Sequence, residues 1–352
     1  MDEKKFIQVV MLGDSLVWSG NVPFGQRYGD FIEQELQARL GDRVLVDVAI
    51  CGDGGDTVGQ ALARLERDVL VYDPGVVLIN LGTNNMLREI NYAEPDLRAV
   101  VGGIRKHRPQ TRIILETVAT IIEKLHSYHN NPDVIKAGGL MHILKTRTHR
   151  IIRRVAREYG VPLHDRFKIF QAAVKVNRSL NDQLICRDGG HLTVAGNRYF
   201  ARSAAVALAA CLERLPKQSA KSAVVWLERA ETNPAFSECC RVLCEGGLDL
   251  FLRSAANWAR LMLQQAWSCA RRAECMATNQ AMRSRAKRVA VLAAAFSALQ
   301  RALPGEVHQP IPADKAANIT WALTQLEAAP CDHRVDQMQK HLRKKRTQSA
   351  LM

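Results

Sequence analysis

Four short polar segments of this sequence each follow an apolar run, and they contain the residue types that acyl transfer requires. The first, Gly13-Asp14-Ser15, follows "FIQVVML" and offers a hydroxyl group. A serine hydroxyl becomes a nucleophile only beside a base that takes its proton, a group that orients this base, and donors that bind the oxyanion formed by attack. The question is therefore whether the other three segments supply these groups.

Each of the other segments offers one of them. "CGDGGDT" contains Gly54 and Gly55, whose backbone N–H groups are open to an oxyanion because glycine has no side chain. "LGTNN" contains Asn84, whose side-chain amide is a second donor. "CRDGGHLT" places Asp188 three residues before His191, a carboxylate and an imidazole on one short turn.

Taken singly, each segment also has an ordinary structural explanation. Gly-Asp-Ser after a strand is common turn and N-cap chemistry. The glycine pair could simply turn the chain, Asn84 could form an Asx turn, and Asp188 and His191 could close a loop onto a helix. Short motifs give many false positives one at a time. Four independent segments that together complete one site favour acyl transfer.

The elements that must position these residues alternate apolar runs with amphipathic stretches. The pattern predicts strands over residues 6–12, 44–50, 76–81, 112–118 and 161–164. It predicts helices over residues 28–40, 58–70, 95–107, 140–159 and 193–215. Continuous apolar strands between helices indicate a doubly wound α/β fold with a parallel sheet. The carboxyl ends of parallel strands meet at one edge, so the polar segments are expected to converge there.

The chain changes character after "LERLPKQSAKSA", which predicts a boundary between residues 1–216 and 217–352. The second part lacks strand patterns and predicts an all-α domain, with at least two helices between residues 248 and 303 and another near 317–326. Apolar side chains at helical spacing are interpreted as its core: Phe251, Ala255, Trp258, Met262, Cys269, Val289, Leu292, Phe296 and Leu299.

The charge is unevenly spread. Of the formal net charge of +14, residues 217–352 carry 20 Lys and Arg against 11 Asp and Glu, and the basic run 340–352 is interpreted as a solvated, frayed end. Basic surfaces can bind nucleic acid, but no recognised nucleic-acid motif is present. All nine cysteines are interpreted as reduced thiols, and a cluster of five at spacings that match no zinc site is interpreted as core: Cys239, Cys240, Cys244, Cys269 and Cys275. The sequence predicts no metal, no signal peptide and no transmembrane segment, and hence a cytoplasmic protein.

The four segments together resemble those of the SGNH (GDSL) hydrolases. "GDSL", "GGDT" and "DGGHLT" match three blocks of that family. The remaining block differs, because the family usually has Gly-x-Asn-Asp where this chain has Gly82-Thr83-Asn84-Asn85. The resemblance covers residues 5–215. The Gly-x-Ser-x-Gly motif of the α/β-hydrolases is absent from the chain.

This resemblance implies a flavodoxin-like sheet and a carboxylic ester hydrolase that uses no cofactor. Ser15 would be the nucleophile, His191 its general base, and Asp188 the group that orients the base. The N–H groups of Ser15 and Gly55 and the amide of Asn84 would form the oxyanion hole.

An alternative base and acid, His164 and Asp165, ends the fifth predicted strand but does not match the family block. His126 and His129 could line the acyl pocket or lie exposed in their loop.

The substrate stays open at this point. Members of the family act on acetylated sugars, short-chain esters, thioesters or lysophospholipids, so a thioesterase or lysophospholipase with the same site is an alternative. A further alternative is a scaffold whose basic helical half binds nucleic acid or a protein partner. Side chains that could border the substrate are Trp18, Val22, Pro23 and Phe24, and the segment 119–138 could cover it.

Overall fold

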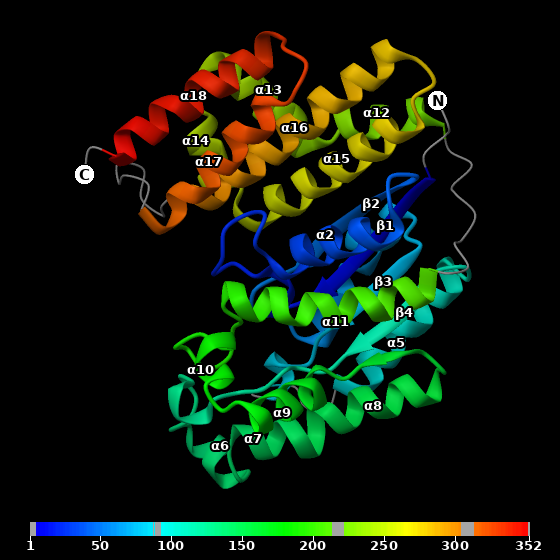
Figure 1. Cartoon of the computed structure of the whole chain (residues 1–352), viewed down its shortest axis with the longest axis vertical. Helices are drawn as coiled ribbons and strands as arrows, with labels where there is room; N and C mark the ends of the chain where they lie inside the picture. Colours follow the sequence, from blue (N-terminus) through cyan, green and yellow to red (C-terminus); the bar gives the residue numbers. More distant parts are fainter. Residues whose placement is uncertain (1–4, 87, 89–92, 213–221, 304–312, 351–352) are drawn as a thin grey trace.

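A computed structural model of the chain describes residues 5–86, 88, 93–212, 222–303 and 313–350 (Figure 1). Its centre is a parallel sheet of five strands in the order β2-β1-β3-β4-β5. The strands are β1 (Lys5–Gly13), β2 (Val44–Gly52), β3 (Val76–Asn80), β4 (Arg112–Glu116) and β5 (Leu163–His164). This is the flavodoxin-like order, so the predicted doubly wound α/β fold is confirmed.

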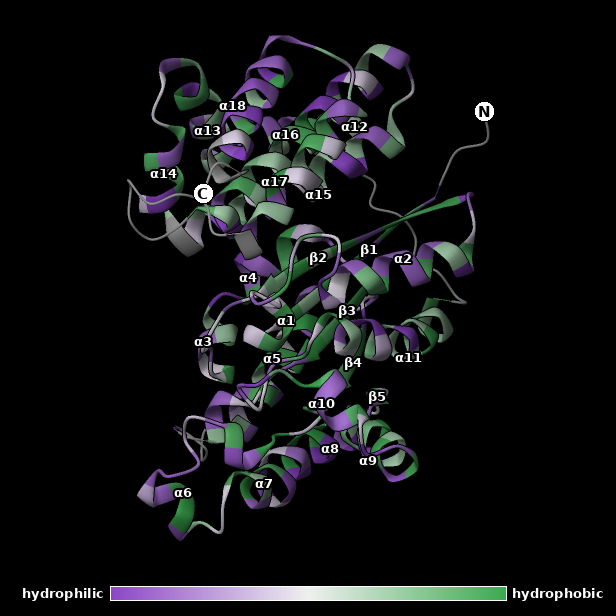
Figure 2. Ribbon diagram, turned by 60° about the vertical axis from the view of Figure 1, so that its left-hand side comes forward, coloured by the Kyte–Doolittle hydropathy of each residue, from purple (hydrophilic) through white to green (hydrophobic). Residues whose placement is uncertain are grey.

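Helices cover both faces of the sheet (Figure 2). On one face lie α2 (Tyr28–Leu40) and α11 (Val194–Leu212), and on the other α3 (Val58–Ala63), α5 (Ala93–His107) and α8 (His149–Glu158). The side chains of β1 alternate between the two cores, with Val9 and Met11 in the first and Val10 and Leu12 in the second. Burial on both faces explains why β1 is apolar throughout.

Two of the predicted helices are broken in the structure. The predicted helix 58–70 is divided into α3, α4 (Leu65–Asp68) and a 3₁₀ turn at Leu70–Tyr72, and Arg64 separates the first two. The predicted helix 140–159 contains α7 (Leu140–Ile143), a π-helical stretch at Leu144–Thr148, and α8. The short helices α6 (Pro132–Lys136), α9 (Arg166–Val176) and α10 (Leu180–Leu184) were not predicted.

The second part of the chain is helical, as predicted. Its helices are α12 (Ala223–Glu231), α13 (Pro234–Glu245), α14 (Leu248–Ser254), α15 (Ala256–Met276), α16 (Gln280–Ala302), α17 (Ala313–Glu327) and α18 (His333–Ala350). They share one apolar core that includes Trp226, Leu263, Phe296 and Leu323.

Two expectations about this part were wrong. Trp258 is 45% exposed rather than in the core, because α14 and α15 are separate helices that meet at Ala255, so one helical spacing does not run through both. The basic run is not frayed over residues 340–350, the part of it that the structure describes. It belongs to α18, which buries Met338 and Leu342 in the helical core.

Cysteine placement agrees in part with the core interpretation. Cys239, Cys240 and Cys269 are buried in the helical core, whereas Cys244 and Cys331 are exposed. All nine cysteines are free thiols. Among the described residues there is no cluster of His, Cys, Asp or Glu that could hold a metal ion. None of the described helices is long and apolar enough to cross a membrane.

The helical part packs beside the β2 edge of the sheet through α15 (Figure 1). Arg271 of α15 anchors this contact by donating to Glu33 (2.9 Å), to Asp47 (2.7 Å) and to the carbonyl of Val46 (3.0 Å). In return, Phe24 from the α/β part inserts into the helical core. The predicted boundary at residues 216 and 217 lies outside the described residues.

Candidate active site

Ser15 lies where β1 turns into the short helix α1 (Ser15–Trp18). Asp14 caps this helix by accepting the N–H of Leu16 at 2.9 Å. Gly13 permits the turn, because a side-chain Cβ at that position would lie 2.6 Å from the carbonyl oxygen of Asn80. The turn presents the half-buried Ser15 at the carboxyl edge of the sheet.

The loop before α11 brings His191 and Asp188 to this edge. The Nε2 atom of His191 lies 2.9 Å from the Ser15 hydroxyl, and its Nδ1 atom lies 2.7 Å from Oδ2 of Asp188. The other oxygen of Asp188 accepts the N–H groups of Gly190 and His191 at 2.9 and 3.0 Å. The structure thus joins the Ser15 hydroxyl, the His191 imidazole and the Asp188 carboxylate in one hydrogen-bonded row, which we call the Ser15 row.

The surroundings favour an ionised Asp188. Partial burial alone would raise the pKa of this carboxyl, but the N–H groups of Gly190 and His191 and the His191 ring lower it below its ordinary value. An ionised carboxylate at Nδ1 favours the tautomer in which Nε2 carries the lone pair. Nε2 can then accept the proton of Ser15.

Asn84 and Gly55 reach the same edge from the loops after β3 and β2. Gly55 has a φ of +83°, a left-handed conformation that favours glycine. The Asn84 amide donates to the carbonyl of Asp56 at 2.9 Å and lies 3.5 Å from Oδ2 of Asp14. Since an amide nitrogen carries two hydrogens and the second contact is long, one donor is only weakly engaged.

Asn85, which stands where the family usually has Asp, links two of these loops. Its side chain is fully buried, and its oxygen accepts the N–H of Val58 at 2.9 Å at the start of α3. An amide oxygen can accept this bond as a carboxylate oxygen would. The substitution therefore keeps the contact between the glycine and asparagine loops.

Asp14 is a buried acid next to the row. Its pKa is raised from 3.8 to about 6, chiefly by burial and to a smaller extent by the nearby Asp56. The N–H of Leu16, the Thr83 hydroxyl and the His191 ring act in the opposite direction. Asp14 is therefore expected to titrate near the lower end of the neutral range.

Arg64, which the sequence did not single out, ties the carboxyl ends of β1 and β2 together. Its guanidinium donates to the carbonyls of Gly13 (2.8 Å) and Cys51 (2.9 Å) and to Asp56 and Asp68 (2.7 Å each). It therefore fixes the two strand ends from which the serine and glycine loops leave. No local motif could have revealed it, because its partners come from three separate segments.

His164 and Asp165, the alternative base and acid, each contact other residues rather than one another. His164 is buried, with Nδ1 2.6 Å from Glu116 and Nε2 2.9 Å from the Ser203 hydroxyl. Asp165 instead pairs with Arg153 at 3.0 Å and caps α9. The pairing of His164 with Asp165 expected in that alternative is not formed.

Ser203, His164 and Glu116 nevertheless form a second serine–histidine–carboxylate row. Ser203 lies within α11 and also donates to the carbonyl of Phe200 at 3.0 Å. Glu116 is fully buried and accepts the Tyr28 hydroxyl at 2.5 Å. These bonds join the sheet to α2 and α11, which is a structural role.

The segment 119–138 packs beside the His191 loop. The N–H of Ile122 donates to the carbonyl of Gly189 at 2.7 Å, and the half-buried His126 lies against Gly190. Burial lowers the pKa of His126, and nearby His191 lowers it further. The segment thus packs against the loop that carries His191. Trp18 and Phe24, in contrast, line a cavity that faces the helical part.

A doubly wound fold with a serine, a histidine and an aspartate in a row at its carboxyl edge is typical of enzymes that hydrolyse esters. Residues 11–199 match the GDSL-like lipase/acylhydrolase family, more than half of the chain. The chain belongs to this family and is an acylhydrolase. None of the curated proteins matches its sequence significantly.

Several solved structures resemble the chain. The acetyl xylan esterase AlAXEase is 27% identical with a TM-score of 0.46, over 57% of this chain and 100% of the other. A lipase/acylhydrolase from Enterococcus faecalis is 20% identical with a TM-score of 0.46, over 60% and 100%. A catalytic mutant of an acetylxylan esterase from Geobacillus stearothermophilus is 20% identical with a TM-score of 0.46, over 62% and 100%.

Proposed function

We propose that the protein hydrolyses carboxylic esters through an acyl-enzyme intermediate on Ser15. The observation that carries this proposal is the row in which Ser15, His191 and Asp188 are joined by contacts of 2.9 and 2.7 Å. It combines a nucleophile, a base within hydrogen-bond reach and a group that orients the base.

The reaction follows from this geometry. The Ser15 oxygen attacks the ester carbonyl carbon while its proton passes to Nε2 of His191. The imidazolium, stabilised by Asp188, then donates this proton to the alkoxide as the carbon–oxygen bond breaks and the alcohol leaves. Water, deprotonated by His191, attacks the acyl-serine, and the acid departs as Ser15 regains its proton.

The oxyanion of each tetrahedral intermediate would be bound by the N–H groups of Ser15 and Gly55 and the side-chain amide of Asn84. In the structure, the Asn84 amide is partly engaged, because it donates to the carbonyl of Asp56. Its weakly engaged hydrogen would turn from Asp14 to the oxyanion. Since the oxyanion exists only along the reaction path, these donors would act mainly on kcat.

An oxyester is the substrate class we propose, with a thioesterase or lysophospholipase as the alternatives. The test compares p-nitrophenyl acetate, a matched acyl thioester and a lysophospholipid with wild-type protein and with Ser15→Ala. We expect turnover of the acetate ester in the wild type and none above background in a folded Ser15→Ala protein. A thioester or lysophospholipid preferred by orders of magnitude in kcat/KM would replace the oxyester, and full activity of Ser15→Ala would exclude Ser15 as the nucleophile.

A further inference from the structure

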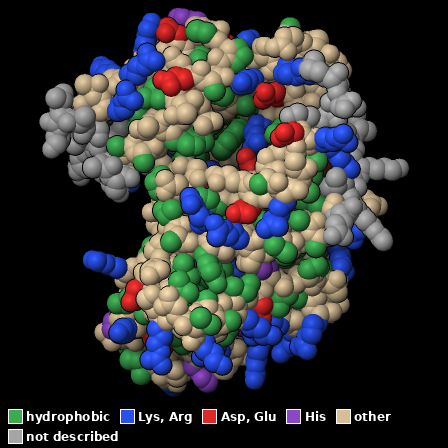
Figure 3. Space-filling view, in the orientation of Figure 1, with side chains coloured by type: hydrophobic (Ala, Val, Ile, Leu, Met, Phe, Trp, Pro, Cys, Tyr) green, Lys and Arg blue, Asp and Glu red, His purple; other side chains and the backbone are tan. Residues whose placement is uncertain are grey.

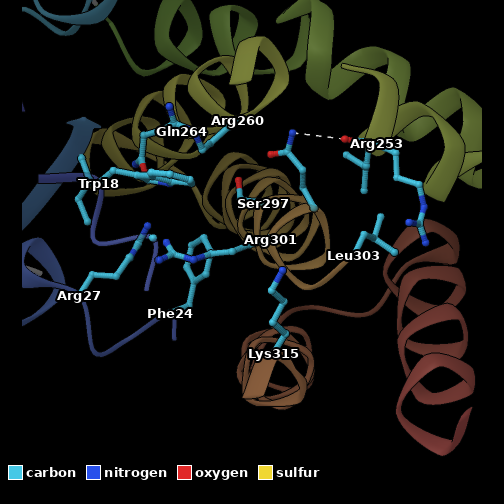
Figure 4. A pocket seen from close by; sticks show the side chains of 14 residues that line it. Trp18, Phe24, Arg27, Arg253, Arg260, Gln264, Ser297, Arg301, Leu303 and Lys315 are labelled. Atoms are coloured by element: carbon cyan, nitrogen blue, oxygen red, sulfur yellow. Dashed lines mark hydrogen bonds between the residues drawn. The ribbon is translucent and has the colours of Figure 1, made fainter. Parts of the chain in front are cut away.

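The cavity lined by Trp18 and Phe24 lies between the α/β part and the helical part (Figure 4). It has a volume of about 310 Å³, which is enough for a small organic ligand. Trp18, at the end of α1, forms one wall, and its ring lies so near Gly54 that a Cβ at that position would be 3.2 Å from it. Helices α15, α16 and α17 supply the opposite walls.

Positively charged side chains from both parts of the molecule point toward this cavity (Figure 4). Arg27 is neutralised by Asp30 at 2.7 Å, and Arg260 by Asp53 at 3.1 Å. Arg301 donates through Nη2 to the carbonyls of Ser19 and Val22. Within the described parts of the chain, neither Arg301 nor Lys315 forms an ion pair with a carboxylate. Five cationic side chains thus line the cavity; Arg27 and Arg260 are paired with acids, whereas Arg301 and Lys315 have no carboxylate partner among the described residues.

The charge of Arg301 is held at a cost. Burial, together with repulsion by Arg27 and Arg260, lowers the pKa of this guanidinium to about 9, and Asp30 offsets these effects only in part. Carbonyl oxygens satisfy hydrogen bonds of a buried cation but do not neutralise it. An anion in the cavity would supply the missing negative charge.

The rest of the lining suits the body of an organic molecule. Trp18, Phe24, Leu252 and Leu303 present apolar surface, and the Trp18 ring has the guanidinium groups of Arg260 and Arg301 within 5.2 and 5.9 Å of its centre. A flat or apolar group can therefore pack on the tryptophan while its charged end meets the cations.

We propose that this cavity binds a small organic phosphate, a phosphate monoester on an aromatic or apolar body. The charges of Arg301 and Lys315, which pair with no carboxylate of the described residues, match the charge of a phosphate monoester, which is about −1.5 to −2 at pH 7. Guanidinium forks also fit the oxygens of a phosphate with paired hydrogen bonds. This site is distinct from the Ser15 row and does not depend on the reaction proposed there.

The test is calorimetric titration of the full-length protein with phenyl phosphate, with phthalate as an aromatic dicarboxylate and phenol as an uncharged analogue. We expect saturable binding of phenyl phosphate at one site per chain, weaker binding of phthalate and none of phenol. Lys315→Gln should weaken the binding by roughly 10- to 100-fold, the cost of one charged hydrogen bond. Arg301→Gln should weaken the binding of phenyl phosphate to a similar degree if it folds. Lys315→Gln is the cleaner test, because Arg301 also donates to the carbonyls of Ser19 and Val22 and Lys315 does not.

Two controls locate the binding. Arg285→Gln removes a surface arginine that pairs with Glu231 at 2.6 Å, and it should bind phenyl phosphate like the wild type. Ser15→Ala should also bind it unchanged. The proposal is overturned if phenyl phosphate does not bind, if Lys315→Gln binds it as tightly as the wild type, or if Ser15→Ala loses the binding. Equal or tighter binding of phthalate would overturn the phosphate assignment.

Discussion

Asp14 is expected to make the stability of the protein depend on pH at the turn that carries Ser15. An oxygen of its side chain caps the helix by accepting the N–H of Leu16, and ionisation must occur in a fully buried position. With the pKa raised to about 6, the folded protein holds a proton that the unfolded chain releases at lower pH. Stability contributed by the protonated group is thus lost as the pH rises from about 4 to 6.

Asp14→Asn is expected to remove this pH dependence, since an amide can cap the helix but cannot ionise. Relative to the variant, the wild type should lose about 2 kcal/mol of unfolding free energy between pH 4.5 and pH 8. Urea denaturation of both proteins at the two pH values measures the difference. A difference that does not change with pH would show that Asp14 does not titrate in this range.

Asn84→Ala should reduce kcat by roughly 100- to 1,000-fold with little change in KM, as expected when one oxyanion donor is lost. Steady-state kinetics on a small activated ester separates the two parameters. If KM rises while kcat holds, Asn84 binds the ground-state substrate and is not an oxyanion donor.

At the scale of elements, the loops of the site are held by strand ends that are themselves tied together. Arg64 joins the ends of β1 and β2 and lies between two acids, Asp56 and Asp68. Arg64 lies where the predicted helix 58–70 is divided into α3 and α4.

Arg64→Leu is expected to lower the free energy of unfolding by about 3–5 kcal/mol, because it removes the ion pair of the buried Asp56 and one of the two arginines that pair with the buried Asp68. Arg67→Leu is the matched control, since Arg67 also pairs with Asp68 but its side chain is 42% exposed, and it should cost about 1 kcal/mol or less. Chemical denaturation compares the two variants. Equal effects would show that Arg64 does not tie the strand ends.

The sequence predicted what depends on local residue order and missed what depends on distant partners. The turn at Ser15, the glycine and asparagine loops and the Asp188–His191 pair are each contained in a few adjacent residues, and the structure brings them together. The end of the fourth strand contains no recognisable motif in the sequence. Glu116 at this end nevertheless accepts hydrogen bonds from Tyr28 and His164, which are far apart in the sequence. Such a network becomes visible only when the elements are packed.

At the scale of the molecule, the helical part is attached to the sheet by a polar contact as well as an apolar one. Arg271 reaches Asp47, which is 1% exposed and also accepts the Gln8 amide at 2.6 Å. On the face seen in Figure 3, Lys and Arg side chains are dispersed over both parts of the molecule. The surplus of basic residues thus forms no single patch on that face.

A chain that ends at residue 216 is expected to fold and to hydrolyse a small activated ester, because the Ser15 row and both cores of the sheet come from residues 5–212. It should unfold at a lower temperature than the full chain, since it loses Arg271 and exposes Phe24. Thermal unfolding and small-ester kcat/KM of the two chains measure both effects. A folded but inactive fragment would show that the helical part completes the active site.

The identity of the nucleophile is tested most directly by labelling, because the chain contains two serines that face a histidine. The protein is treated with a fluorophosphonate, which reacts with activated serines, and the labelled peptide is mapped by mass spectrometry in the wild type, Ser15→Ala and Ser203→Ala. We expect one label, on Ser15. Ser203→Ala should keep both this label and ester hydrolysis, and Ser15→Ala should lose both. A label on Ser203, or none on Ser15 in an active protein, would contradict the assignment of Ser15 as the nucleophile.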